Sequence, residues 1–118
     1  MILVDTSVWI DHIRGTGKLT ELLSQRQVVA HPFIIGELAC GTLPNRRLTL
    51  HHLRSMPSIA PVTDATLLGF IELHNLMGCG VGYVDMHLLA AAATCQLKLH
   101  TRDKRLLRVA TDLSLDYH

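Results

Sequence analysis

The chain has 118 residues, enough for one domain with a single hydrophobic core. Apolar residues make up 48% of the chain and charged residues 18%, which excludes an intrinsically disordered protein. No apolar run approaches the roughly 18 residues that a membrane-spanning helix needs. The formal net charge of +1 says little by itself about partners, because the positive charges are grouped rather than spread.

The amino-terminal half alternates between short apolar runs and segments with helix signals. Thr6 and Ser7 are candidate caps for the first helix, and Pro32 suits the first turn of a later one. In chain order we expect a strand over 2–4, a helix that follows it, a helix over 18–27, a strand over 28–30, a helix over 32–41 and a basic amphipathic segment over 45–56.

The carboxy-terminal half repeats this alternation. Thr63 is a candidate cap, Gly78 a candidate helix stop, and the alanine-rich stretch after the glycine loop at 78–82 is strongly helical. We expect a strand over 58–62, a helix over 63–77, a helix over 83–96, a strand over 97–101, a short helix over 104–110 and a final strand over 113–116.

Short apolar strands separated by helices predict an α/β fold with a mainly parallel sheet covered on both faces. Functional residues in such sheets collect beyond the carboxyl ends of the strands. The first residues, Met-Ile-Leu-Val-Asp, lack the basic start of a signal peptide, so we expect a cytoplasmic protein. Cys40, Cys79 and Cys95 are odd in number and widely spaced, so we expect small core residues and no disulfide or zinc site.

Three carboxylates occur alone in otherwise apolar segments. Asp5, Glu37 and Asp85 each have no other Asp, Glu, Lys or Arg within five positions. Burying an isolated charged carboxylate is unfavourable, so each needs a partner. One interpretation is that each acid separately caps a helix or accepts bonds from backbone amides. The other is that the acids converge on a cation, since two carboxylates about 4 Å apart repel by about 4 kcal/mol at an effective dielectric near 20.

Convergence would make a site for a hard divalent cation. The candidate ligands are all oxygens, which Mg²⁺ prefers, and the eight histidines include no His-Glu-x-x-His motif. Asp103 follows the expected strand over 97–101 and is a fourth candidate at the same sheet edge. Positive charges group in two stretches, Arg46 to Arg54 and Arg102 to Arg108, which are either solvated helix faces or contacts to RNA.

Four motifs together resemble the PIN-domain ribonucleases, and within them the VapC-type toxins of bacterial toxin–antitoxin pairs. The motifs lie in order along essentially the whole chain, at Asp5–Trp9, Ile35–Leu38, Gly82–Ala90 and Thr101–Leu106. The resemblance implies a three-layer α/β/α sandwich spanning residues 1–118 as one nuclease domain. It also implies a homodimer, inhibited by a small antitoxin encoded alongside.

Carried over residue by residue, the acidic quartet of the family falls on Asp5, Glu37, Asp85 and Asp103. The resemblance implies that these residues bind Mg²⁺, for which Mn²⁺ can substitute, and that metal-activated water hydrolyses RNA phosphodiester bonds to leave 5′-phosphate ends. The hydroxyl residues of the first and last motifs are Ser7 and Thr101, which would orient carboxylates or waters. Arg102 and Lys104 are candidate RNA contacts.

The chain departs from the family at two positions. The glycine loop has Cys79 where close relatives are expected to have a basic residue, which puts a substrate contact in doubt. The first motif has Ser7 where many relatives have Asn, a change that should leave the mechanism intact.

Other functions fit less well and remain as alternatives. A haloacid-dehalogenase phosphotransferase needs an Asp where this chain has Ser7, and a response-regulator receiver needs an early acidic pair that is missing. The glycine loop over 78–82 lacks a Walker lysine. Two hypotheses compete with the ribonuclease. One is another metal-dependent phosphoryl hydrolase, and the other is a binding module that keeps the PIN-like fold without catalysis. Trp9 bears on the second, because aromatic residues are enriched at interfaces.

Overall fold

Three short parallel strands form the centre of the computed structural model, which describes residues 1–118. β1 (Ile2–Val4) lies between β2 (Val28–Val29) and β3 (Lys98–His100) in the order β2-β1-β3. Every residue of β1 and β2 is buried, as parallel strands covered on both faces require. The predicted α/β class with a parallel sheet is confirmed.

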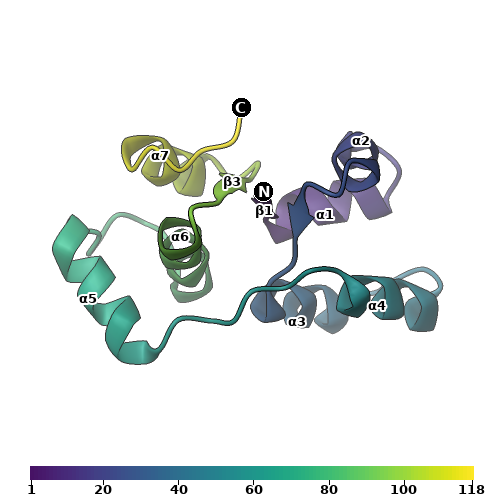
Figure 1. Cartoon of the computed structure of the whole chain (residues 1–118), viewed down its shortest axis with the longest axis horizontal. Coiled ribbons are helices and arrows are strands. Elements are labelled where there is room, and N and C mark those ends of the chain that lie inside the picture. The colour runs from purple at the N-terminus through teal and green to yellow at the C-terminus, as the bar shows by residue number, and fades with distance from the viewer.

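Seven helices surround this sheet (Figure 1). The strands lie at the centre of the view, with α1 and α2 to the right, α5 and α7 to the left, and α3 and α4 below. The helices are α1 (Thr6–Ile13), α2 (Leu19–Ser24), α3 (Pro32–Cys40), α4 (Arg46–Ser55), α5 (Asp64–His74), α6 (Tyr83–Cys95) and α7 (Lys104–Asp112).

The alanine-rich helix α6 is the most buried helix and packs against β3 and α5. Leu88 and Leu89 are fully enclosed, and so is the run Ala90–Ala92 that follows them. Because alanine side chains are short, the backbone of α6 can approach its neighbours closely on more than one side. The burial of residues 86–92 agrees with the lack of a polar face along this part of α6.

Helix starts and stops agree with the sequence signals where a local cause acts. Pro32 begins α3, and Gly41 follows its last residue, as predicted. The first helix is capped by Asp5 rather than by Thr6 or Ser7, because the Asp5 carboxylate accepts a bond from the next backbone amide. The helix expected over 18–27 covers only Leu19–Ser24.

The helix expected to reach residue 77 ends at His74. Asn75 stops α5 by adopting a left-handed conformation with φ 55°, which asparagine tolerates better than most residues. Gly78 was therefore the wrong stop signal, although its own φ of +68° also needs glycine.

Two expected strands are reduced to single bridges. Within 58–62 only Ser58 pairs, with Ala30, since Pro61 lacks the N–H that a longer ladder would need. Within 113–116 only Asp116 pairs, with Leu99, because Ser114 has a left-handed φ of 58° that interrupts the extended chain.

The expectation that the cysteines are core residues was wrong for Cys40 and Cys95, which are exposed. Cys79 is partly buried and packs against the core, and all three are free thiols. Cys40 and Cys95 are the last residues of α3 and α6, where those helices extend beyond the core.

No helix combines the length and the apolar character that crossing a bilayer requires.

Candidate metal centre

The four predicted acids come from four elements near the carboxyl ends of β1 and β3. Asp5 directly follows β1 and caps α1, and Asp103 follows β3 and caps α7. Asp85 lies in the first turn of α6, and Glu37 lies in α3. Strand ends thus place two of the acids, and helices packed beside the sheet place the other two.

Asp5 is held by three hydrogen bonds. Its side chain is buried, with the residue 6% exposed. One carboxylate oxygen accepts from the Thr6 amide at 2.6 Å, and the other accepts from the hydroxyls of Ser7 at 2.9 Å and Thr101 at 2.6 Å. Three donors fix the orientation of the carboxylate.

The two predicted hydroxyl residues also tie together the loops that follow β1 and β3. The Ser7 hydroxyl accepts from the Arg102 amide at 3.1 Å, and the Thr101 hydroxyl accepts from the Asp103 amide at 3.0 Å. Both hydroxyls therefore donate to Asp5 and accept from the backbone leading to Asp103. This arrangement couples the positions of the two carboxylates.

Asp103 and Glu37 are exposed and only partly engaged. One oxygen of Asp103 accepts from two amides of the first turn of α7, and its other oxygen has no protein donor. One oxygen of Glu37 accepts from the Thr6 hydroxyl at 2.7 Å, which links α3 to the end of β1. The role of Thr6 was missed in the sequence, where its only signal was its place beside Asp5.

Asp85 makes no hydrogen bond within the protein and is half-buried. Burial, followed by the negative charges of Asp5, Asp103 and Glu37, raises the pKa of Asp85 from 3.8 to about 6. Asp5, Asp103 and Glu37 therefore all lie within electrostatic reach of Asp85. The alternative in which each acid is satisfied separately does not describe Asp85.

No protein cation balances this charge. The two ion pairs of the chain join Arg102 to Asp11 and His118 to Asp116, so none of the four acids takes part. In their present positions no three His, Cys, Asp or Glu side chains are close enough together to hold a metal ion. The donor set nevertheless fits a hard divalent cation, because Asp85, Glu37 and Asp103 keep carboxylate oxygens without a protein donor.

The predicted RNA contacts differ in their surroundings. The guanidinium of Arg102 is paired with Asp11 of α1, whereas Lys104 is exposed and has no partner. The glycine loop that contains Cys79 packs against α7: a Cβ at Gly80 would stand 3.3 Å from Cδ of Arg105. An arginine from another element therefore lies beside the loop in which a basic residue was expected.

Two buried histidines, His31 and His87, lie at the start of α3 and in α6, the helices that carry Glu37 and Asp85. The Nδ1 atom of His31 accepts from the Phe33 amide at 3.0 Å and so caps α3, the helix of Glu37. The Phe33 ring lies edge-on to both His31 and His87 of α6. Burial and the neighbouring His87 lower the pKa of His31 to about 4, so His31 is neutral at physiological pH.

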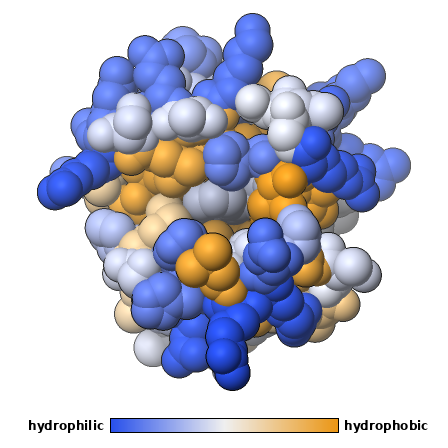
Figure 2. Space-filling view, turned by 90° about the vertical axis from the view of Figure 1, so that its right-hand side faces the viewer, coloured by the Kyte–Doolittle hydropathy of each residue, from blue (hydrophilic) through white to orange (hydrophobic).

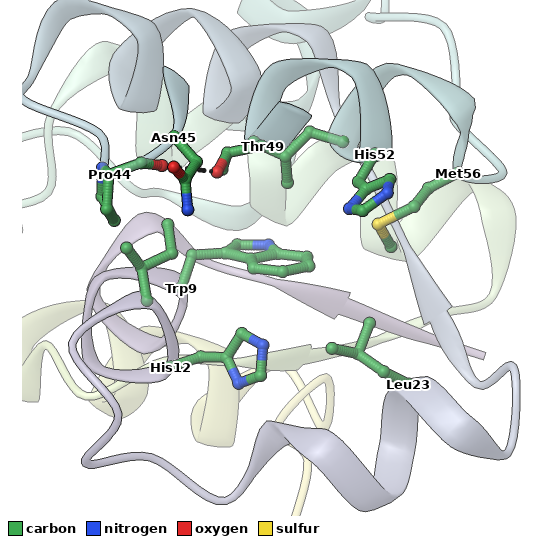
Figure 3. A pocket seen from close by; sticks show the side chains of 10 residues that line it. Trp9, His12, Leu23, Pro44, Asn45, Thr49, His52 and Met56 are labelled. Carbon is green, nitrogen blue, oxygen red and sulfur yellow. Dashed lines mark hydrogen bonds between the residues drawn. The ribbon is translucent and has the colours of Figure 1, made fainter. Parts of the chain in front are cut away.

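An apolar pocket of about 460 Å³ lies between α1, α2 and α4. Trp9 forms one wall and is 4% exposed, with His12 and Leu23 on one side of its ring and Thr49 on the other (Figure 3). Figure 2 looks onto this side of the molecule and shows apolar surface framed by hydrophilic side chains. A second pocket shares Ile13 and Pro44 with the first and extends to Glu37.

The fold and the four carboxylates described above agree with one class of protein. The family model described as PIN domain matches residues 2–112, and the chain belongs to this family. Its relatives include Ribonuclease VapC32 of Mycobacterium tuberculosis, in strains CDC 1551 and H37Rv. Each is 42% identical over 108 residues, which span 90% of this chain and 87% of that protein.

Solved structures share the fold at low sequence identity. FitAcB from Neisseria gonorrhoeae has a TM-score of 0.66 and 18% identity, over 94% of both chains. FitAB bound to an IR36 DNA fragment has a TM-score of 0.67 and 15% identity, over 94% of this chain and 91% of that one. A toxin–antitoxin complex from Klebsiella pneumoniae has a TM-score of 0.64 and 19% identity, over 87% of both.

Proposed function

We propose that the chain is a metal-dependent endoribonuclease and the toxin of a toxin–antitoxin pair, with residues 1–118 acting as one nuclease domain. The observation that carries the proposal is that three carboxylates, Asp5, Asp103 and Glu37, act electrostatically on a fourth at Asp85, while none of the four is paired with a protein cation. The 42% identity to a protein named as a ribonuclease supports RNA as the substrate. An RNA substrate would place the activity in the cytoplasm, as expected from the sequence.

Asp5, Asp85 and Asp103 would hold the cation, and Glu37 would be a fourth ligand or would position the attacking water. Mg²⁺ is the proposed ion and Mn²⁺ a substitute, because both take oxygen ligands. A bound divalent ion makes water more acidic and neutralises charge that develops on phosphoryl oxygens.

The protein groups divide the remaining work. Thr101 and Ser7 hold the Asp5 carboxylate in place, so that it does not have to reorganise during the reaction. Thr6 holds one oxygen of Glu37 and leaves the other available to accept a proton or a hydrogen bond from water. Attack by water rather than by the ribose 2′-hydroxyl would leave 5′-phosphate ends.

Removal of the metal is expected to abolish cleavage. The measurement incubates the protein with 5′-labelled structured RNA in Mg²⁺, then in excess EDTA, and then after Mg²⁺ is restored in excess. Activity should disappear and return, and the products should be substrates for a 5′-phosphate-dependent exonuclease. Cleavage that continues in EDTA would contradict the metal mechanism, and no cleavage of any RNA would favour the non-catalytic binding module.

We propose that the antitoxin binds the pocket beside Trp9. The lining is mainly apolar, and the pocket adjoins a second one that reaches Glu37, so a protein segment could cover the pocket and approach the acids. Co-expression with the small protein encoded alongside is expected to yield a complex that His52→Glu weakens. His51→Glu is the matched control, because the neighbouring His51 lies outside this pocket. Equal weakening by both changes would contradict the placement.

A homodimer is also proposed. Leu68, Leu73 and Met77, in and just after α5, and Tyr83 at the start of α6 expose large apolar surfaces, with Leu73 75% exposed. Such exposure is unusual on a monomer and supports coverage by a second copy. Sedimentation equilibrium is expected to give twice the chain mass, and Leu73→Glu is expected to shift it toward the monomer. A monomeric wild type would contradict the proposal.

A further inference from the structure

Helix α4 has two different faces. Thr49, Leu53 and Met56 line the pocket beside Trp9, and Leu53 is buried. Another face of α4 carries Arg47, His51 and Arg54. These residues line a separate shallow hollow together with Leu50 and Ser55. Spacings of four and three residues put Arg47, His51 and Arg54 on one side of the helix. The basic face of α4, as we call these three residues, is exposed along its length.

The charge of the basic face is not neutralised within the protein. Residues 38–63 hold three of the eleven lysines and arginines of the chain and none of its ten acids. Arg46 differs from its neighbours, since its guanidinium donates to the carbonyls of Ala39 at 2.7 Å and Gly41 at 3.2 Å and so closes the end of α3. Arg47 and Arg54 make no hydrogen bond or ion pair through their side chains, so they are available to a partner.

Helix α4 packs against α3, the helix that carries Glu37. The bond from Arg46 to Ala39 places the first turn of α4 against the last turn of α3, and Ala39 is two residues beyond Glu37. From there α4 extends for 10 residues, which is about 15 Å. A polymer strand bound at the four carboxylates could therefore continue along the basic face.

The four carboxylates repel the phosphates of RNA, and the positive charges of the basic face would offset this repulsion. Phosphates are repelled by the acids before metal binds, whereas affinity for RNA comes mainly from cations that contact phosphates. Exposed arginines away from the four carboxylates can supply that affinity without disturbing the metal ligands. Arg102 is less suited to this task because Asp11 already neutralises it.

We propose that the basic face of α4 binds the sugar–phosphate backbone of the RNA next to the cleavage site, and this inference rests on the proposed ribonuclease function. Arg47 and Arg54 contact phosphates, and His51 adds a hydrogen-bond donor between them. Contacts of this kind position the strand and are independent of base sequence.

The test measures binding of a fluorescent single-stranded RNA by anisotropy, in EDTA, at about 50 to 200 mM salt. The double variant Arg47→Gln with Arg54→Gln should reduce the slope of log affinity against log salt by about 1.4, since each lost phosphate contact removes about 0.7 for single strands. Across that range the wild-type affinity should fall about sevenfold more than that of the double variant. Glutamine is a good helix former, and circular dichroism checks the fold.

Arg26→Asn is the matched control. Arg26 is exposed and lies before β2, at the opposite sheet edge from the acids, and asparagine tolerates its φ of 56°. Arg26→Asn should bind RNA like the wild type, whereas Arg54→Gln alone should lose about half of the slope change. An unchanged slope in the double variant, or an equal change in Arg26→Asn, would overturn the inference.

Two further outcomes separate the hypotheses. If the double variant keeps RNA binding but loses binding to a polyglutamate peptide, the face belongs to an acidic protein segment and the RNA assignment is overturned. If the slope changes as expected but the wild type cleaves no RNA in Mg²⁺, the contact to RNA stands and the proposed nuclease function fails.

Discussion

Asp5→Asn is expected to reduce RNA cleavage by about a thousandfold or more while leaving the chain folded. Loss of a buried carboxylate proposed to bind the metal should remove several kcal/mol of charge stabilisation, and about 4 kcal/mol corresponds to that factor. Asparagine keeps the size of the side chain and an oxygen that can accept from the Thr6 amide. The hydroxyls of Ser7 and Thr101 can rotate to accept from the new amide group.

The measurement for Asp5→Asn is the cleavage rate of labelled RNA in saturating Mg²⁺, with binding of the same RNA measured separately. The affinity for RNA in EDTA should change by less than the cleavage rate. The proposed role of Asp5 is at the reacting phosphate, whereas most contacts that bind the strand lie elsewhere. Asp112→Asn, an exposed change at the end of α7, is the matched control and should cleave like the wild type. Cleavage within tenfold of wild type in Asp5→Asn would remove Asp5 from the proposed ligand set.

Asp85→Asn is expected to stabilise the metal-free protein and to abolish its stabilisation by Mg²⁺. Burial and three neighbouring acids raise the pKa of Asp85 from 3.8 to about 6, so folding favours the protonated form. The ionised carboxylate therefore destabilises the fold at neutral pH, by about 1–2 kcal/mol after allowance for its partial exposure. Asparagine removes this charge and should raise Tm in EDTA by about 3–10 °C at pH 7.5.

The pH dependence of this effect follows from its sign. The destabilisation is complete well above pH 6 and disappears only as the pH falls below 3.8, where Asp85 is protonated in both the folded and the unfolded state. Thermal unfolding in EDTA should thus give the largest gain for Asp85→Asn at pH 7.5, a smaller gain as the pH falls through 6, and none once the pH is well below 3.8. With Mg²⁺ in excess at pH 7.5 the order should reverse, because only the wild type gains binding energy.

The control for Asp85→Asn is again Asp112→Asn, which should not change Tm in either condition beyond a degree or two. A lower Tm for Asp85→Asn in EDTA at pH 7.5 would mean that Asp85 stabilises the fold and that the acids do not repel one another in the metal-free protein.

Local chemistry made much of the fold predictable. Three features could be predicted because each depends on residues close in sequence. They are the apolar run that ends in Asp5, the proline at the start of α3 with a glycine after its end, and the alanine-rich helix α6. The isolation of Asp5, Glu37 and Asp85 in apolar segments was readable for the same reason, since a charge needs a partner wherever the segment folds.

Signals that compete locally were less reliable. Asn75 ended α5 before Gly78 could, and Pro61 limited the expected strand over 58–62 to one bridge at Ser58. Cys40 and Cys95 are exposed because the helices that carry them extend past the core, a fact that residue type alone does not contain.

The sequence by itself determined which carboxylates lack a local partner and therefore require a distant one. Only the tertiary structure decided what meets them: the Thr101 hydroxyl lies 96 positions from Asp5 and donates to it, Thr6 donates to Glu37, and Arg102 is taken by Asp11. It also decided that Arg46 of α4 closes the end of α3 while Arg47 and Arg54 stay unpaired. The physical reason is that hydrogen bonds and charges act over a few ångströms, and folding alone sets which residues lie that close.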